Sequence, residues 1–172
     1  MSGMSTPPAP NSRERVRNAL RAAGLDCEIV ETPDSARTAV EAAAAVHASV
    51  GQIVKSLIFL CDDQPVLALV AGDNRLDEGL LAELAGGAIT RADAARVRAH
   101  TGFAIGGVAP VGSLEPLPVF CDADLLEHDY VWAAAGAPQA VFRVEPHALA
   151  KAAGATVAEL AQRRPAAEGP PH

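Results

Sequence analysis

The chain has 172 residues, which is enough for one compact domain with a hydrophobic core. Apolar residues make up 49% of it, aromatic residues only 3%, and the formal net charge is −7. That charge disfavours a large surface for non-specific nucleic-acid binding, and the apolar runs are too short to span a membrane. The first residues also lack the apolar core of a signal peptide. We therefore expect a globular cytoplasmic protein without a membrane partner.

The N-terminal part of the chain predicts two capped helices and a short strand. Residues 1–10, rich in proline and serine, are predicted to be disordered. Asn11 and Glu14, and again Thr38 and Glu41, have the spacing of a residue that caps a helix and the acid three positions later. The elements predicted here are a helix over 11–24, a strand over 27–31 and a helix over 38–47.

The next stretch predicts a buried hairpin. Residues 53–61 and 65–71 are almost continuously apolar and are joined by the short polar segment 62–64. Such runs are typical of strands that are covered on both faces, so we expect this hairpin in the middle of a sheet.

The remainder predicts an alternation of short helices and strands. Strands outnumber strand–helix–strand units, and several adjoin directly in the sequence. We therefore predict the α+β class, a mixed β-sheet or barrel with flanking helices, as a single domain over 11–162. The further elements are helices over 76–87 and 92–99, strands over 88–90, 119–121, 130–134 and 140–144, a helical turn near Leu125, helices from Pro146 to about Gln162, and a disordered tail over 163–172.

The three cysteines, Cys27, Cys61 and Cys121, are far apart, and each lies in an apolar run. An odd number without metal-ligand spacing indicates reduced, buried thiols and neither a disulfide framework nor a metal site. None of them lies at a strand-to-helix turn that would lower its pKa, which disfavours a catalytic thiol.

Charged residues are unevenly distributed along the chain. Arginines gather at 13–21 and 91–98, and acids at 115–129. These arginines suit either a patch that recognises one end of a tRNA or two solvated helix faces.

Residues 101–112 (TGFAIGGVAPVG) form an apolar loop rich in glycine. Gly106 and Gly107 allow another molecule to approach the backbone, and Pro110 restricts both itself and Ala109. A stiff loop of this kind can direct N–H groups at a carbonyl or an oxyanion. The alternative is a strand that ends in a bulge and a tight turn.

Lys55 is unusual because it lies inside an apolar strand, in a chain with two lysines and twelve arginines. Alternation places it on the same face as Ile53 and Leu57. An unpaired buried ammonium is costly, so Lys55 must extend to solvent, pair with an acid such as Asp122, or open into a cavity. In the last case it is a cationic group that can hold a carbonyl or a phosphate.

These segments, taken together and in order, resemble the YbaK/ProX family of aminoacyl-tRNA deacylases, free-standing relatives of the editing domain of bacterial prolyl-tRNA synthetases. The resemblance rests on QIVKSLIF, the turn GDNRLD, TGFAIGGVAPVG, PLPVFCD and YVWAAAG, and it runs from about Asn11 to Leu160. It implies hydrolysis of the ester of a mischarged aminoacyl-tRNA after release from the synthetase.

The resemblance also implies site residues. The family's lysine matches Lys55, and its Gly-x-x-x-Pro loop, whose backbone holds the aminoacyl carbonyl, begins at Gly106. The lysine is implicated in holding the terminal adenosine and phosphate end of the substrate and in supporting catalysis. The residues carried over are Lys55, Gly106 and Gly107 as catalytic, and Val108, Ala109, Pro110, Gly136 and Thr38 as substrate-binding.

The family's chemistry needs no metal, no cofactor and no nucleophilic side chain; a water helped by a ribose hydroxyl of the substrate is its proposed nucleophile. Orientation and oxyanion stabilisation are sufficient for a labile ester. The implied partners are the acceptor end of an aminoacyl-tRNA and, transiently, prolyl-tRNA synthetase, because the substrate must be reached before elongation factor binds it.

Gly136 departs from the alanine-specific branch of the family, which has histidine at the aligned position. Glycine there is more typical of branches that remove cysteine, serine, threonine or other small residues, so we expect a small amino acid without fixing which. His128 is interpreted as a solvated side chain on a turn, and His100 as the end of a helix.

Two other functions remain open. The chain could be a non-catalytic module that binds a tRNA acceptor end or a synthetase, in which case every aminoacyl-tRNA would decay at the rate seen in buffer alone. Hydrolysis that depends on Cys61 or Cys121 would instead be abolished by alkylating agents.

Overall fold

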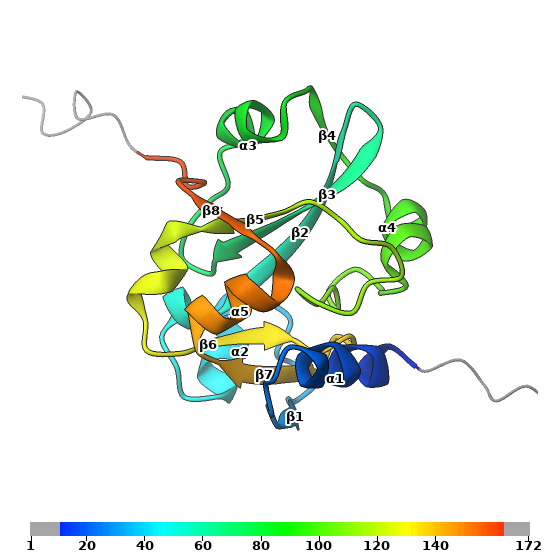
Figure 1. Cartoon of the computed structure of the whole chain (residues 1–172). Coiled ribbons are helices and arrows are strands. Elements are labelled where there is room, and N and C mark those ends of the chain that lie inside the picture. Colours follow the sequence, from blue (N-terminus) through cyan, green and yellow to red (C-terminus); the bar gives the residue numbers. More distant parts are fainter. Residues whose placement is uncertain (1–10, 164–172) are drawn as a thin grey trace, which may run out of the picture.

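The computed structural model of the chain, described over residues 11–163, consists of two β-sheets with helices around them (Figure 1). Strands β1, β7 and β6 form a three-stranded antiparallel sheet, and the second, five-stranded sheet has the order β4-β2-β3-β5-β8. The strands are β1 (Ile29–Glu31), β2 (Val54–Cys61), β3 (Gln64–Ala71), β4 (Ile89–Arg91), β5 (Val119–Asp122), β6 (Val131–Ala134), β7 (Ala140–Val144) and β8 (Thr156–Ala158). The helices are α1 (Ser12–Ala22), α2 (Ala39–Ala45), α3 (Glu78–Ala85), α4 (Ala94–Thr101) and α5 (Pro146–Ala153), with 3-10 turns η1 (Val50–Gln52) and η2 (Ala123–Glu127).

Helices α1 and α2 begin where their capping residues predict. The Asn11 side chain accepts a hydrogen bond from the backbone N–H of Glu14. Thr38 and Glu41 form a reciprocal capping box at the start of α2, which satisfies backbone donors that a helix start leaves without partners.

The hairpin β2–β3 forms the centre of the five-stranded sheet, which confirms the prediction. Asp62 and Asp63 make its two-residue turn, both with positive φ, and pair Cys61 with Gln64. Every residue of β3 after Gln64 is buried. Alternate residues of the hairpin therefore supply two separate hydrophobic clusters, one on each face of the sheet.

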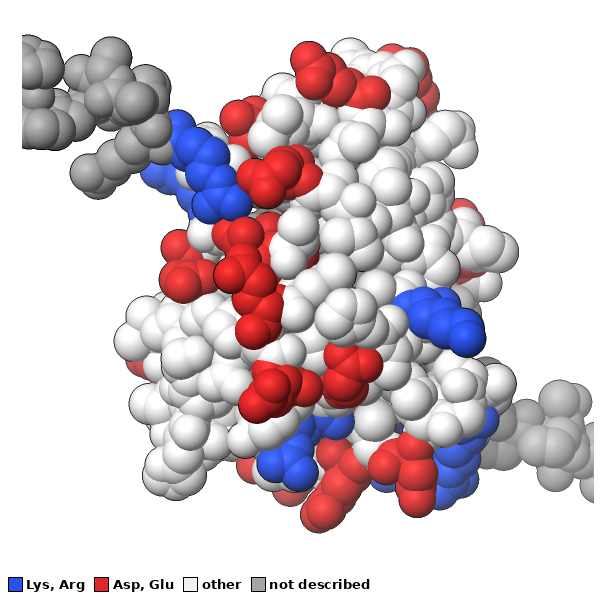
Figure 2. Space-filling view, turned by 60° about the vertical axis from the view of Figure 1, so that its left-hand side comes forward, with Lys and Arg blue, Asp and Glu red and all other residues white. Residues whose placement is uncertain are grey.

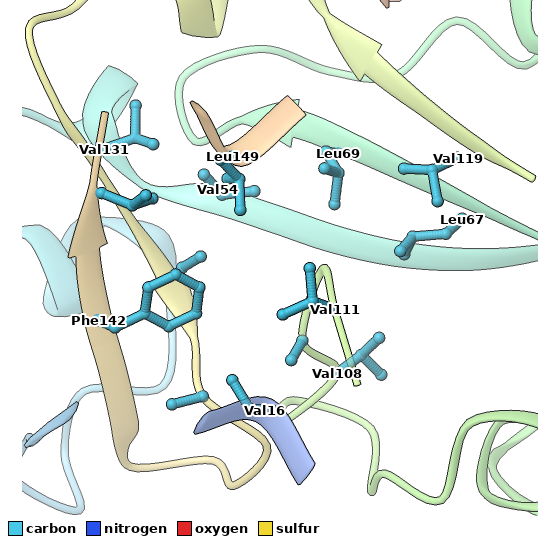
Figure 3. Packing of buried hydrophobic residues seen from close by; sticks show 14 of the residues in the cluster. Val16, Val54, Leu67, Leu69, Val108, Val111, Val119, Val131, Phe142 and Leu149 are labelled. Carbon is cyan, nitrogen blue, oxygen red and sulfur yellow. The ribbon is translucent and has the colours of Figure 1, made fainter. Parts of the chain in front are cut away.

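The larger cluster fills the space between the two sheets. It joins Val54 and Leu69 of the hairpin to Val131 and Phe142 of the smaller sheet, and it includes Val16 of α1 (Figure 3). The smaller cluster lies on the other face of the five-stranded sheet, beneath α3 and the C-terminal segment.

Strand β2 has one incompletely covered edge. Along the edge away from β3, strand β4 pairs only with Phe59–Cys61, and a single bridge joins Ile53 to Trp132 of β6. The stretch Val54–Ile58 between them has no ladder partner on this side among the described residues. This open edge positions the site described below.

The structure corrects three details of the prediction. The sheets of the described part do not close into a barrel. The helical prediction up to Gln162 is wrong, because α5 ends at Gly154 (φ 63°) and residues 156–158 form β8, parallel to β5. Helix α4 begins after Asp93, which caps it, instead of at residue 92.

The limits of the chain are only partly covered by the structure. The predicted disorder of 1–10 and 164–172 falls outside the described residues. Arg163 is described, and it pairs with Asp124 and Glu159. Within residues 11–163, no helix has the length and apolar character needed to cross a membrane.

Leu160 tests the packing of the C-terminal segment. Its side chain is fully buried in the smaller cluster, whereas Val157 of β8 is 42% exposed. We expect Leu160→Ala to lower the free energy of unfolding by about 2–5 kcal/mol in urea denaturation, and Val157→Ala to lower it by less than about 1 kcal/mol. Equal losses would contradict the packing described here.

Candidate functional site

A cavity of about 1290 Å³ lies along the open edge of β2. Its walls come from α2, from the turn after β3, from the glycine loop and from β6. Lys55, Thr38, Gly106 and Val108, all predicted from the sequence as site residues, line this one cavity. Other lining residues include Arg37, Val54, Ser56, Ile58, Arg75, Glu78, Arg91, Ala92, Val97, Ile105, Trp132, Ala133, Pro138, Gln139 and Val141.

Lys55 is half-buried, and its ammonium donates a short hydrogen bond to the backbone carbonyl of Asn74. Burial lowers the pKa of Lys55, while the negative charges of Asp73 and Asp122 oppose that shift. Lys55 forms no ion pair within residues 11–163. The lysine therefore reaches the cavity with its charge only partly compensated.

Asp122 does not pair directly with Lys55, contrary to one of the sequence alternatives. Its side chain is fully buried and accepts hydrogen bonds from the backbone N–H of Ala71, at 3.1 Å, and from Nδ2 of Asn74, at 2.8 Å. The same Asn74 amide donates to Asp124, which also binds Arg163. Asp122 thus fixes the turn whose carbonyl holds Lys55.

The glycine loop enters the cavity at Gly106. This residue is exposed with φ 91°, and a Cβ added to it would meet no atom within 4 Å, so a ligand can approach its backbone. Gly107 is buried, and a Cβ there would lie 2.9 Å from the backbone of Ala137. Its N–H already donates to the carbonyl of Ala104 at 2.9 Å, so Gly107 shapes the loop and has no free donor of its own.

Three predicted substrate contacts lie away from the cavity. Ala109 and Pro110 are buried behind the lining residue Val108. Gly136 has φ 95°, and a Cβ there would lie 2.7 Å from the carbonyl oxygen of Ser12, so it packs against the start of α1. In this conformation Ala109, Pro110 and Gly136 do not line the cavity, so they can influence a substrate only through the shape of the site.

Among residues 11–163, no histidine or cysteine is part of the cavity lining. His128 was interpreted as a solvated side chain, but it is half-buried. Its ring and the Asp73 carboxylate both lie next to Gly51. Cys61 and Cys121 are buried, and burial with the nearby charge of Asp122 raises the pKa of Cys121 to about 11. A thiol that is both buried and protonated is a poor nucleophile.

The cavity lining is positively charged although the protein is acidic. Arg37, Arg75 and Arg91 join Lys55 there, against one acid, Glu78. The face shown in Figure 2 carries more acidic than basic side chains.

Of the arginines emphasised from the sequence, at 13–21 and 91–98, only Arg91 lines the cavity. Arg15 lies over the Phe103 ring and donates to the carbonyls of Thr101 and Gly112, so it supports the glycine loop. Trp132 and Ser56 were also missed, although Trp132 is the chain's one tryptophan and Ser56 adjoins Lys55.

Comparison with known proteins identifies the fold and the family. The family profile described as the aminoacyl-tRNA editing domain matches residues 33–152, more than half of the chain. The chain belongs to this family. The matched range contains Lys55, the glycine loop and most of the cavity lining, as the resemblance to YbaK/ProX proteins predicts.

A solved structure of the editing-domain type superposes closely on this chain. It is described as that of a candidate trans-editing enzyme for prolyl tRNA synthetase, is 48% identical, and gives a TM-score of 0.84 over 93% of this chain and 100% of its own. The shared mixed α+β fold has two open sheets, as described above.

Curated relatives include both long and short proteins. A proline–tRNA ligase of Nitratidesulfovibrio vulgaris (strain DP4) is 39% identical over 104 residues, which are 60% of this chain but 18% of the ligase. The uncharacterized protein YwhH of Bacillus subtilis (strain 168) is 28% identical over 141 residues, 81% of this chain and 90% of YwhH. The chain therefore corresponds to about a fifth of the ligase and to nearly all of the short relative.

The pKa of Lys55 can be measured because the editing domain has only one other lysine, Lys151. In a Lys151→Arg variant, the single lysine signal in a ¹³C NMR titration belongs to Lys55. We expect its midpoint below the ordinary value of 10.5. At pH values between the lowered pKa of folded Lys55 and 10.5, the unfolded chain binds more protons than the folded one. In that range the contribution of Lys55 to the free energy of unfolding therefore rises with pH. A midpoint at or above 10.5 would contradict the burial described here.

Proposed function

We propose that this editing-domain protein hydrolyses, in trans, the ester of a tRNA mischarged with a small amino acid, with the proline tRNA as the candidate carrier. The observation that carries the proposal is that Lys55 and Gly106 line one cavity whose other charged residues are mostly arginines. Family membership supports an editing role, and the similar structure described as a candidate trans-editing enzyme supports action as a free-standing protein.

The loop backbone is proposed to bind the aminoacyl carbonyl. The N–H groups of Gly106 and Val108 make no backbone hydrogen bond within the described residues, unlike that of Gly107. Donors fixed by a rigid loop stabilise the oxyanion that forms when water attacks an ester, and each is worth roughly 3 kcal/mol. The attacking water is oriented by a ribose hydroxyl of the substrate, as the family resemblance implies.

Lys55 and the arginines are proposed to hold the 3′ end of the tRNA. A partly desolvated ammonium interacts more strongly with a phosphate or carbonyl than one in water does. Arg75 and Arg91 are exposed beside the cavity, where they can contact the phosphates that precede the terminal nucleotide. Trp132 is half-buried in the wall and offers an aromatic face for stacking of a base.

Replacing Lys55 tests the proposed activity. With tRNAs charged with alanine, cysteine, serine or threonine, we expect the wild type to deacylate at least one of them above the buffer-only rate. Lys55→Ala should lower kcat/KM on that substrate on the order of 100-fold, because the cationic contact is lost. Lys151→Ala, on the exposed side of α5, should leave it unchanged.

Circular dichroism of each variant controls for misfolding, and Lys55→Met provides a second variant without charge. Wild-type rates equal to buffer for every substrate, together with tRNA binding, would instead indicate a non-catalytic module. Loss of activity after alkylation would indicate the thiol-dependent alternative.

The arginines predict a salt-dependent affinity. Arg75→Glu should lower kcat/KM about tenfold at low salt and reduce the slope of its logarithm against log salt concentration by about one, since one phosphate contact is lost. Arg17→Glu makes the same charge change on the exposed face of α1 and serves as the matched control. Equal effects of the two variants would show that overall charge, and not the cavity, attracts the tRNA.

A further inference from the structure

The open edge of β2 presents unused backbone groups to the cavity. Gly72 N–H donates to the carbonyl of Ile53, so Ile53, Lys55 and Leu57 direct their backbone groups at β3. The backbone N–H and C=O groups of the intervening residues, Val54, Ser56 and Ile58, point away from β3, toward the open edge. Because β4 pairs only from Phe59 onward, the N–H and C=O of Ser56 point to the unpaired part of this edge.

The side chain of Ser56 is also without a partner. Its hydroxyl oxygen is buried and makes no hydrogen bond to any described residue, and it is the one buried side-chain polar atom of residues 11–163 in that condition. Leaving a buried hydroxyl unpaired is costly, and such groups are rare in folded proteins. Because Ser56 lines the cavity, a polar atom of a bound ligand would supply the partner that this hydroxyl lacks.

Ser56, and not Lys55, lies on the face of β2 toward the glycine loop. Its neighbours on that face, Val54 and Ile58, pack in the same cluster as Val108, whereas Leu57 and Phe59 belong to the opposite cluster. Val97 and Ala133 of that first cluster also line the cavity. The surroundings of the Ser56 side chain are therefore apolar and suit a small group with a single polar atom.

We propose that the Ser56 hydroxyl binds the β-hydroxyl or β-thiol of the amino acid carried by the substrate, and that it thereby selects serine, threonine or cysteine over alanine. The proposal rests on the deacylase function proposed above. In this proposal the hydroxyl, which is buried in the structure, turns into the cavity by rotation about χ1 when the substrate binds. Ser56 as a whole is only half-buried and lines the cavity, so a ligand can contact this residue.

The backbone of β2 offers a reason why the Ser56 hydroxyl should bind the side chain of the amino acid and not its ammonium group. Every aminoacyl ester carries an α-ammonium group, for which the outward C=O groups of β2 are ready acceptors. The Ser56 side chain leaves the strand perpendicular to those carbonyls. A site built to bind a hydroxyl discriminates against the analogue that lacks it, because the protein's own polar group is then left unpaired.

The test compares kcat/KM of the wild type and Ser56→Ala on one tRNA charged in turn with serine, threonine, cysteine and alanine. We expect Ser56→Ala to reduce the rate for the β-hydroxy and β-thiol substrates by roughly tenfold to a hundredfold. The rate for the alanine ester should stay within about twofold, so the preference of the enzyme shifts toward alanine. Ser113→Ala, whose hydroxyl binds the Glu115 carbonyl outside the cavity lining, is the matched control.

Each other outcome overturns the proposal in a recognisable way. An equal loss on all four esters would place the hydroxyl at the shared ester or ammonium group, and no loss on any would exclude contact. A wild type inactive on every ester, with Lys55→Ala unchanged from it, would refute the deacylase function itself. Thermal melting of Ser56→Ala shows whether the variant is folded. A Ser56→Thr variant retains the hydroxyl and should retain activity on the β-hydroxy and β-thiol substrates, which distinguishes a lost contact from a folding defect.

Discussion

The site depends on one buried carboxylate. Asp122 at the end of β5 is fully buried, yet its oxygens are satisfied by the N–H groups of Ala71 and Asp124 and by the amide of Asn74. Hydrogen bonds to a charged acceptor are each worth about 1.5–3 kcal/mol, so the turn after β3 has little freedom. The carbonyl of Asn74 on that turn then fixes the ammonium of Lys55. The position of the cation is thus set by parallel pairing of β3 and β5 in the sheet.

A second constraint acts on the glycine loop, which also lines the cavity. The loop around Gly106 is held from behind, where Phe103 is fully buried beneath the guanidinium of Arg15 and Gly107 leaves no room for a side chain beside Ala137. The loop is rigid at its base and open at Gly106. Preorganised donors of this kind need little rearrangement during a reaction, which is the condition under which backbone N–H groups contribute most to ester hydrolysis.

Much of the fold was predictable because local signals and tertiary structure agree. The helix caps at Asn11 and Thr38 and the apolar hairpin are each specified by residues that are close together in the sequence. Strand β8 was not predictable, because Thr156–Ala158 pairs only with β5, a contact distant in sequence, and the surrounding alanine, glutamate and leucine favour helix.

From the residues alone, the site was predictable where a residue contradicts its surroundings, as Lys55 and Gly106 do; Thr38 and Val108, which also line the cavity, do not stand out in this way. Arg75, Trp132 and Ser56 have ordinary sequence contexts, and the open edge that brings them together depends on where β4 stops pairing. Gly136 was assigned from an aligned position, and the structure shows that this position faces α1.

The distribution of charge bears on which part of a polyanion this protein can bind. An acidic surface repels the body of a nucleic acid, while the arginines beside the cavity attract phosphates over about one Debye length, roughly 8–10 Å at physiological salt. A single-stranded end can enter such a cavity, whereas a duplex would bring many phosphates against acidic side chains. The combination therefore favours a flexible terminus over a helical stem. Under the proposed function, discrimination among tRNAs would then come from the few groups inside the cavity or from a second protein, and not from a broad basic surface.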